Sequence, residues 1–581
     1  MNPKSSYQAP VLHPIKMEGE GVIAASTQDF GAGKRYDLGH DTPQSLTRGL
    51  FRFAKNLLPL LAAAALLLPA CSSDDDPAAT PEGKTRITLT AGIDEVTTRT
   101  TYTDGGTGTG TDGNPADKVN VVWTSGTDNE KLSAVIYNNN NPSSVQPDAL
   151  TGSGTGTKSM TFSGTVTQNT GGTLGEDAHN YFYDPAGKAD DSQLGERGQI
   201  SFGLSSQTCN VTAPLEGLKN YDIMYTEEAT DKGNITLKHA CALVRFNLPL
   251  DTDKVITQIT MSANNSGTLC NRVILTYDAA GKVTATKSGD GTLTLNITGD
   301  DATTHTRTLE AYLMLPVASD GTTKLDGLLV KVSAIATDGT VYSRMLNLTE
   351  ATNETLLGGK CYTFFGVNTD TPLAEDRWAG SNIYHNGSSF TFHAPNVIRY
   401  TNYQGLFFKW GSTVGIAPNS PVGSWYTYPK VGASNPGSDW GAITYDGSTD
   451  LCTTISSAYR MPTLSEMQAL VDLPATDKLS IGTWESITST TTNRQGTTLI
   501  PSGIVAGNVF FPAAGSITDS LGEAGIELNY WSSNATGAVF ANSLYAWKSA
   551  TPGTSLKIAN YGKDYGFSIR CIKKTDAELS E

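Results

Sequence analysis

The sequence predicts a mainly β protein that is exported from the cell and folds as several domains. Three observations support this prediction. Charged residues make up only 17% of the chain, and glycine occurs 59 times in 581 residues, a composition typical of exported β proteins rather than cytosolic helical ones. Short β-prone runs alternate with turn residues, which favours β-sandwiches. Tryptophans gather toward the C-terminus, which indicates a last domain of different character.

The first 70 residues are predicted to be a leader that ends in a secretory signal peptide. Residues 57–70, "LLPLLAAAALLLPA", are apolar but fewer than the roughly 20 residues that a membrane-spanning helix needs. Arg48, Arg52 and Lys55 precede this run, as the basic flank of a signal peptide does. The stretch before that flank is too long for such a leader, and a start codon assigned too early would explain residues 1–45.

The end of the apolar run, "LPAC" at residues 68–71, resembles the lipobox of bacterial lipoproteins. The resemblance implies cleavage before Cys71 and a lipid on its thiol, which would anchor the chain in the outer membrane. The "SSDDD" that follows resembles the acidic export signal that sends lipoproteins of Bacteroidota-like cells to the outer face. The simpler alternatives are an ordinary cysteine and a solvated acidic spacer. Residues 71–85 are polar and proline-containing, and are expected to form a tether.

The net charge limits the binding partners that the chain can have, and the cysteine content limits its possible disulfides. The formal net charge of −16 argues against nucleic acid or an anionic bilayer as a partner. An even number of cysteines after Cys71 permits disulfides in an exported protein, although six cysteines allow fifteen pairings. These six are Cys209, Cys241, Cys270, Cys361, Cys452 and Cys571.

A strand pattern begins directly after the tether. Residues 86–93, "RITLTAGI", place apolar side chains on one face at period two, which predicts a half-buried strand. Three later motifs, in this order, resemble the fimbrillin family, whose members build type V pili in Bacteroidota. They are "NYDIMYT" at residues 220–226, "ITLKHACALVRFNL" at 235–248 and "LLGGKCYTF" at 356–364.

This resemblance implies two consecutive transthyretin-like β-sandwiches, at residues 86–250 and 251–370. It also implies assembly with other fimbrillin subunits by donor-strand exchange. In that family a first strand is lost by cleavage after an arginine, which corresponds here to a cut between Arg99 and Thr100. Loss of residues 86–93 would leave unpaired backbone groups that a partner's strand could fill. An ordinary surface arginine is the alternative.

The chain changes character after residue 370. Seven of its eight tryptophans lie there: Trp378, Trp410, Trp425, Trp440, Trp484, Trp531 and Trp547. The motifs "YQGLFFKWGS", "YRMPTLSEMQAL", "FFPAAG", "NYWSS" and "GFSIRCIKK" occur in this order. They resemble the FISUMP-type modules found at the ends of surface lipoproteins, which are related to C-type-lectin-like and sulfatase-modifying domains. The resemblance implies an α+β, C-type-lectin-like domain at residues 371–581.

Two local features of this domain can be interpreted further. In "TLSE", Thr463 can cap a helix while Glu466 reaches back, which would turn Met467 and Leu470 toward a core. Sulfatase-modifying enzymes need reactive cysteines. We nevertheless expect Cys452 and Cys571 to form a structural disulfide, and two free thiols there would reopen an enzymatic interpretation.

No catalytic motif stands out. The chain lacks the Trp-Asn-Asp of calcium-dependent lectins, a Gly-x-Ser-x-Gly followed by an ordered acid and histidine, and histidines at zinc spacing. We therefore expect a protein that is not an enzyme and uses no metal or cofactor. An enzyme with an unrecognised site on the last domain is the least favoured alternative.

Aromatic residues give the best indication of a binding surface, because they stack on sugars and proteins at low entropic cost. Trp425, Tyr426 and Tyr428, in the loop-like "PVGSWYTYPK", are the candidates for ligand binding. Trp410 and Trp531 lie in apolar runs and are expected in the core. The expected ligand is a host or microbial glycan or protein.

Two functions therefore compete. The first is a tip adhesin of type V-like fimbriae, anchored at the cell surface by lipid and released into extracellular fimbriae after cleavage. The final residues, "IKKTDAELSE", lack the alternation of a donor strand, which fits a tip position. The second is a stand-alone, glycan-binding surface lipoprotein that does not polymerise.

Overall fold

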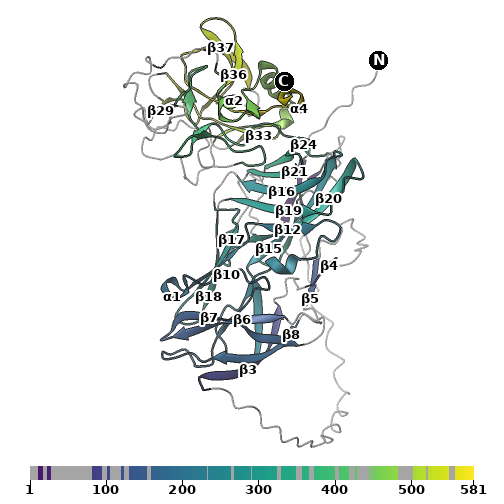
Figure 1. Cartoon of the computed structure of the whole chain (residues 1–581), viewed down its shortest axis with the longest axis vertical. Helices are drawn as coiled ribbons and strands as arrows, with labels where there is room; N and C mark the ends of the chain where they lie inside the picture. Colours follow the sequence, from purple (N-terminus) through teal and green to yellow (C-terminus); the bar gives the residue numbers. More distant parts are fainter. Residues whose placement is uncertain are drawn as a thin grey trace, which may run out of the picture.

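The computed structural model is mainly β, as predicted, and its units follow one another along the long axis of the molecule (Figure 1). It describes residues 11–16, 22–27, 82–93, 101–104, 119–122, 130–153, 159–231, 233–263, 267–289, 291–323, 329–347, 356–364, 372–398, 405–417, 425–427, 443, 447, 449–481, 484, 502–518, 521–548 and 556–580. No helix among these residues has the length and apolar character needed to cross a bilayer.

The first unit is a closed barrel. Its strands hydrogen-bond in the order β13-β14-β3-β8-β7-β6-β9 and return to the start, instead of forming two separate sheets. The strands are β3 (Lys84–Ile93), β6 (Lys131–Asn138), β7 (Asn141–Ser153), β8 (Ser159–Thr167), β9 (Asn180–Tyr183), β13 (Met224–Tyr225) and β14 (Gly233–His239). The strand predicted from residues 86–93 is therefore part of the barrel wall.

The second unit contains three sheets. A six-stranded sheet has the order β12-β19-β16-β21-β22-β24, a three-stranded sheet the order β20-β15-β23, and a four-stranded sheet the order β10-β11-β17-β18. Their bounds are β10 (Ala189–Asp190), β11 (Gln199–Gly203), β12 (Gln207–Asn210), β15 (Cys241–Asp251), β16 (Ile256–Ala263), β17 (Arg272–Tyr277), β18 (Val283–Ser288), β19 (Thr292–Thr298), β20 (Thr306–Pro316), β21 (Leu329–Ala336), β22 (Val341–Asn347), β23 (Cys361–Phe364) and β24 (Ala374–Glu375).

Strand β15 separates two hydrophobic cores. Successive side chains of a strand point to opposite faces, so Val244, Phe246 and Leu248 pack into the core under the six-stranded sheet. Cys241 and Leu243 pack instead into the core that the four-stranded sheet shares with the barrel. This arrangement explains why β15 reads as a nearly continuous apolar run in the sequence.

The division expected near residue 250 does not coincide with the change in strand pairing. β15 ends at Asp251, yet it pairs along its whole length with β20 and in parallel with β23. Strands β10, β11 and β12 also precede residue 250 but pair with β17 and β19. Judged by strand pairing, the last barrel strand, β14, ends at His239. Strands β10 to β12 lie between barrel strands in the sequence but belong to the sheets of the second unit.

The C-terminal domain is built on a seven-stranded sheet with the order β29-β28-β27-β39-β36-β37-β38. These strands are β27 (Phe407–Phe408), β28 (Val414–Ile416), β29 (Trp425–Thr427), β36 (Glu527–Ala535), β37 (Phe540–Trp547), β38 (Lys557–Gly562) and β39 (Phe567–Ser568). A second sheet holds β31 (Lys478–Ile481), β32 (Gly503–Ala506) and β33 (Val509–Pro512). The α-helices among the described residues of this domain are α2 (Leu451–Ile455), α3 (Leu464–Val471) and α4 (Asp576–Leu579).

Shorter elements complete the described parts of the chain. The two-stranded pairs are β1 (Val11–Lys16) with β2 (Val22–Thr27), β4 (Thr101–Asp104) with β5 (Val119–Val122), β25 (Tyr384–His385) with β26 (Phe390–Thr391), β30 (Tyr459–Arg460) with β40 (Ile572–Lys573), and β34 (Ser516–Ile517) with β35 (Leu521–Gly522). The remaining helical turns are α1 (Leu194–Arg197), η1 (Leu218–Tyr221) and η3 (Ala475–Asp477).

Helix α3 begins where the capping signal places it. The Thr463 side chain accepts from the Glu466 amide, and the Glu466 carboxylate accepts in return from the Thr463 amide. Met467 and Leu470 are buried against the sheets, as expected. Trp410 and Trp531 also lie in the core, as predicted.

The C-terminal domain is joined to the second unit by a buried polar contact. Lys331 on β21 lies 2.5 Å from the Asp376 carboxylate and donates to the Asn508 carbonyl at 3.1 Å. Asn508 in turn donates to the Ser343 carbonyl at 2.9 Å. Lys331 and Asp376 are 2% and 4% exposed. An apolar cluster crosses the same junction and contains Leu329, Ile398, Ile481, Val505 and Phe510.

Candidate functional site

The structure describes only some of the candidate site residues. Cys71, Arg99, Thr100 and Tyr428 lie outside the described residues. The strand that cleavage between Arg99 and Thr100 would release, β3, is described in full.

Strand β3 closes the barrel. It pairs antiparallel with β8, from Lys84 opposite Thr167 to Gly92 opposite Ser159. On its other side it pairs in parallel with β14, from Leu89 opposite Gly233 to Ile93 opposite Leu237. Because no other described strand joins β8 to β14, the ring of hydrogen bonds depends on β3.

The side chains of β3 also fill the barrel interior. Ile87, Leu89 and Ala91 are at most 2% exposed and belong to the barrel core, whereas the intervening Arg86 and Thr88 are exposed. Loss of β3 would remove three apolar side chains from that core and leave the facing backbone groups of β8 and β14 unpaired. What would remain is a groove able to receive an extended strand with apolar residues at alternate positions.

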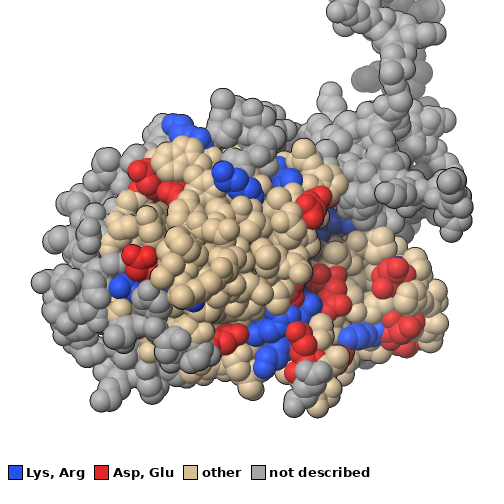
Figure 2. Space-filling model, turned by 90° about the horizontal axis from the view of Figure 1, so that it is seen from above, with Lys and Arg blue, Asp and Glu red and all other residues tan. Residues whose placement is uncertain are grey.

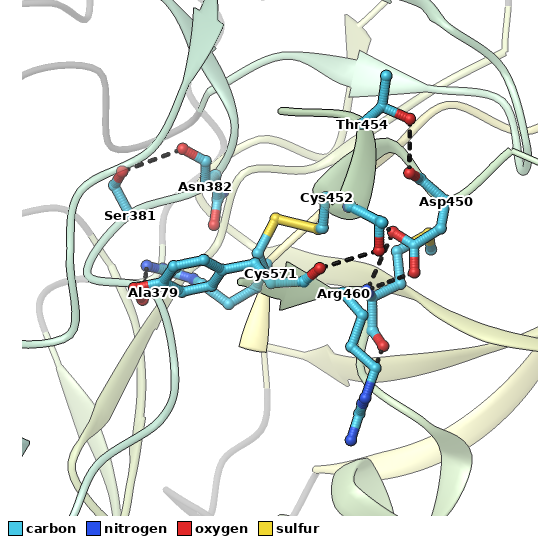
Figure 3. The surroundings of a disulfide bond; sticks show 12 residues. Ala379, Ser381, Asn382, Asp450, Cys452, Thr454, Arg460 and Cys571 are labelled. Carbon is cyan, nitrogen blue, oxygen red and sulfur yellow. Dashed lines mark hydrogen bonds between the residues drawn. A yellow bond between two sulfur atoms is a disulfide. The ribbon is translucent and has the colours of Figure 1, made fainter. Parts of the chain in front are cut away.

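Cys452 and Cys571 are joined by a disulfide in the C-terminal domain (Figure 3). Their Cα atoms lie 5.6 Å apart, 119 residues separate them in the sequence, and both side chains are fully buried. Cys452 lies on α2, whose N-terminus is capped by Asp450, and the Cys571 carbonyl accepts from the Ala379 amide at 2.8 Å. The pair that was expected to bond is thus bonded, and neither sulfur is a thiol available for chemistry.

Arg570, the neighbour of Cys571, is buried in the C-terminal domain. It is 2% exposed and donates to the carbonyls of Ala379 at 3.0 Å and Phe510 at 2.7 Å. Burial lowers its pKa, while Tyr530 beside it acts in the opposite direction. These contacts tie three segments of the domain together and assign Arg570 a structural role.

The predicted ligand-binding aromatics lie at one edge of the seven-stranded sheet. Trp425 and Tyr426 belong to the edge strand β29, where they pair with Ile416 and Gly415. The expectation of a loop there was therefore wrong for these two residues. Their side chains lie outside the described parts of the chain, so the structure does not place them against a ligand surface.

An open pocket of about 510 Å³ lies at the opposite edge of the same sheet. Its described lining consists of Val539, Phe540, Asn560, Tyr561, Gly562, Asp564 and Tyr565. The hairpin of β37 and β38 supplies one side, and the turn after β38 supplies the other. In Figure 1 this hairpin lies at the end of the molecule far from the barrel.

Aromatic rings form the apolar part of the pocket. The centroids of Tyr561 and Tyr565 lie 5.5 Å apart with their planes at 55°, and Tyr561 packs edge-on against Phe567 beneath. Phe540 and Val539 at the rim are 50% and 57% exposed. Burial is the main cause of a raised pKa at Tyr561, so its hydroxyl stays neutral at physiological pH.

The conformation of the turn after β38 determines which of two neighbouring charged side chains, Lys563 or Asp564, lines the pocket. The Lys563 amide donates to the Val539 carbonyl at 2.9 Å, and its ammonium lies 4.4 Å from the centre of the Trp410 ring. Lys563 is only 8% exposed. Asp564 lines the pocket and its carboxylate folds over Gly562, where a Cβ atom would collide with it. Among the described lining residues Asp564 is thus the sole charged side chain.

The end face of the C-terminal domain carries few charges in its centre. Figure 2 shows this face as a broad uncharged area, with most acidic and basic residues around it. Within the described residues, no group of three or more His, Cys, Asp or Glu side chains is placed to hold a metal ion.

This pocket has no recognisable signature in the sequence. Its residues come from "AVF" at 538–540 and "NYGKDY" at 560–565, which match no contiguous binding motif. The spacing of Tyr561 and Tyr565 on either side of Lys563 and Asp564 is the sequence feature that could have indicated the pocket. That spacing does not predict that the Lys563 side chain packs inward against Trp410 while Asp564 lines the pocket.

Comparison with known proteins gives only distant matches. No family model matches the chain, and no curated protein matches its sequence. Similar solved structures include a "putative cell adhesion protein" from Bacteroides uniformis ATCC 8492, with 13% identity, a TM-score of 0.27, and coverage of 48% of this chain and 93% of that chain. A protein of the same description from Bacteroides ovatus ATCC 8483 shows 12% identity, a TM-score of 0.27, and coverage of 50% and 95%.

The tip fimbrial protein Mfa3 from Porphyromonas gingivalis, truncated at its C-terminus, is similar at 11% identity with a TM-score of 0.20. That match covers 45% of this chain and 81% of that chain. With likeness this low, the case for a function depends on the residues and geometry of this chain itself.

Proposed function

We propose that this protein is a cell-surface adhesin that becomes a subunit of type V-like fimbriae when its first strand is replaced by a strand from another subunit. The observation that carries the proposal is the position of β3, which alone among the described strands links β8 to β14. A barrel closed by its first strand is open to strand exchange, because the replacement needs only matching backbone groups and alternating apolar side chains.

Cleavage after Arg99 would supply the switch. Arg99 follows the last residue of β3, Ile93, by six positions, so a cut there would separate β3 and the lipidated Cys71 from the rest of the chain. Before the cut the chain is an anchored monomer at the outer membrane. After it, the groove between β8 and β14 accepts the strand of a neighbouring fimbrillin subunit.

The C-terminal domain acts in this proposal as a lectin-like, ligand-binding module without enzymatic activity. It is held firmly by the Lys331–Asp376 contact. Its end face, which has few charges in its centre (Figure 2), lies away from the barrel (Figure 1). A tip position follows from this orientation, because a module at the far end of a subunit is free to meet a host or microbial ligand.

The second candidate is a surface lipoprotein that binds a glycan and never enters a filament. The aromatic pocket at β37 and β38 favours it, because the pocket needs neither cleavage nor a partner subunit. In this case β3 remains in the barrel permanently and Cys71 keeps its lipid.

Isolation of surface filaments and N-terminal sequencing of this polypeptide in them tests the choice. We expect a start at Thr100, and an Arg99→Ala variant should be absent from filaments and remain in the membrane fraction. Arg86→Ala, which changes an exposed arginine within β3, is the matched control and should assemble normally. Filament-associated protein that still begins at lipidated Cys71 would contradict the strand switch.

A further inference from the structure

We propose that the pocket formed by Tyr561, Tyr565, Asn560 and Asp564 binds an uncharged sugar. The proposal rests on the ligand-binding role proposed above for the C-terminal domain and specifies the chemical class of that ligand. Three properties of the pocket lead to it: the arrangement of its rings, the hydrogen-bonding groups beside them, and the sign of its charge.

The rings provide faces on which a sugar can stack. Tyr561 and Tyr565 are inclined to each other at 55° with centroids 5.5 Å apart, so together they form two sides of a shallow angle. The apolar C–H face of a pyranose packs well against such rings, as amphipathic ligands do on tyrosine. The volume of about 510 Å³ falls in the range of roughly 300–1,000 Å³ usual for small-molecule sites.

The polar groups match hydroxyls. Asn560 brings an amide that can donate and accept, and Asp564 brings a carboxylate that accepts two or more hydrogen bonds. A sugar presents hydroxyls, each of which donates and accepts, around the rim of an apolar ring face. Hydrogen bonds to an ionised carboxylate are the stronger kind, so Asp564 is the principal orienting group.

The charge of the pocket selects against acidic sugars. Asp564 would repel the carboxylate of a sialic or uronic acid and the sulfate of a sulfated glycan. The neighbouring base, Lys563, is 8% exposed, and its ammonium lies over the Trp410 ring. The described lining therefore offers an acidic ligand no cation.

Aromatic rings beside a carboxylate can also hold an organic cation. The geometry favours a sugar, because the rings of Tyr561 and Tyr565, with centroids 5.5 Å apart and planes inclined at 55°, form two sides of an open angle and do not enclose a central point. Asn560 would also have no role opposite a quaternary ammonium, which has no group to pair with it. Binding of an organic cation instead of a sugar is therefore one of the outcomes that the test distinguishes.

The test measures binding of the purified full chain to immobilised oligosaccharides. Neutral probes are oligomers of glucose, mannose, galactose and N-acetylglucosamine, and acidic probes are sialyllactose and oligogalacturonate. We expect at least one neutral probe to bind, and both acidic probes to bind at least about tenfold more weakly, a difference of one unit in log Kd.

Variants connect that binding to the pocket. Tyr565→Ala and Asp564→Asn should each weaken the neutral probe by about tenfold or more, and Asp564→Asn should also reduce the discrimination against acidic probes. Gly562→Ala keeps every functional group but displaces the Asp564 carboxylate, so it should weaken binding without unfolding the domain. Trp547→Ala removes an aromatic side chain of the same hairpin, 39% exposed and outside the lining, and should bind like the natural chain.

Three results would overturn the proposal: no binding to any neutral probe, equal binding by Tyr565→Ala, or displacement of the sugar by millimolar tetramethylammonium in preference to free sugar. These results are independent of filament assembly. A protein that enters filaments but binds no neutral sugar contradicts only the sugar site, whereas one that binds sugar but never enters filaments contradicts only the fimbrial role.

Discussion

The barrel and the C-terminal domain are closed in opposite ways. The barrel is closed by hydrogen bonds and apolar packing of β3, a strand near the N-terminal side of the described chain. The C-terminal domain is closed by a covalent bond between Cys452 and Cys571. A closure made of backbone hydrogen bonds can be exchanged for an equivalent strand, whereas a disulfide cannot be exchanged without redox chemistry. Under the strand-exchange proposal, β3 is therefore the replaceable closure of the barrel, whereas the disulfide keeps the C-terminal domain closed.

The largest expected effect is the loss of the barrel when β3 is absent. A chain that begins after Ile93 should lack the cooperative unfolding transition of the barrel, because Ile87, Leu89 and Ala91 leave its core together. A synthetic peptide "KTRITLTAGI" should restore the transition in differential scanning calorimetry. The same peptide with Leu89→Asp is the control and should not restore it. A barrel that melts normally without β3 would refute the idea that this strand closes it.

The next effect concerns the disulfide. Replacing Cys452 and Cys571 by alanine should lower the stability of the C-terminal domain by about 4–5 kcal/mol, since the bond closes a loop of 119 residues and restricts the unfolded chain accordingly. Denaturant titration followed by tryptophan fluorescence would measure this loss. Reductant should have the same effect on the natural chain and none on the double variant. The transition of the barrel should not move in either experiment, and a shift there would contradict independent closure.

Acid should weaken the barrel through His179. Its Nδ1 and Nε2 lie 2.8 and 2.9 Å from the carbonyls of Asp177 and Thr167, and burial lowers its pKa even though both carbonyls favour the charged ring. The unfolded chain therefore binds a proton more readily than the folded one. Stability should be full above the unfolded pKa of about 6.5 and should fall as the pH drops below it, by about 1.4 kcal/mol for each unit by which the two pKa values differ.

Barrel stability measured between pH 8 and pH 5 checks this expectation, and His179→Gln is the informative variant. Its stability at pH 8 can differ from that of the natural chain, but the slope against pH over this interval should be smaller. An unchanged slope would show that another group causes the pH dependence.

The smallest effect lies at α4. Glu578 pairs with Arg460 at 2.6 Å and with Arg377 at 3.1 Å, and the hydrogen bond from Arg460 is the main reason that its pKa is lowered to about 2. The contribution of this carboxylate is present above the unfolded pKa of about 4.3 and is lost as the pH falls toward 2. Because the pair is partly exposed, Glu578→Gln should cost less than about 1 kcal/mol.

Amide hydrogen exchange in α4 is the suitable measurement for Glu578→Gln, with Asp576→Asn on the same helix as the control. Faster exchange limited to the Glu578 variant is expected. Equal exchange in both variants would mean that the ion pairs do not hold the helix.

The sequence predicted the features that depend on local chemistry. The alternation in residues 86–93 identified β3, and Thr463 with Glu466 located the start of α3. The expected pairing of Cys452 with Cys571 is also present. The partners of β3 could not be predicted, because β14 lies about 145 residues further along and parallel pairing leaves no turn signal between them.

The change in strand pairing and the pocket could not be predicted from the sequence, for related reasons. β15 is buried on both faces, so its apolar run fits a strand of either unit equally well. The pocket combines two strand ends with one turn, and its character depends on the direction of the Lys563 side chain. Such a direction is set by packing against Trp410, 153 positions earlier in the chain.

The buried contact at the junction has a mechanical consequence. A pull on a ligand at the far end of the C-terminal domain reaches the second unit through Lys331, Asp376 and Asn508, and through the short pairing of β22 with β24. The Lys331 ammonium and the Asp376 carboxylate are almost fully buried, so separating them would leave two buried charges without each other. Removing one partner of a buried ion pair typically costs about 3–5 kcal/mol. We therefore expect the joint to act as a stiff coupling under tension and not as a hinge, so that load would pass along the length of the molecule to the barrel.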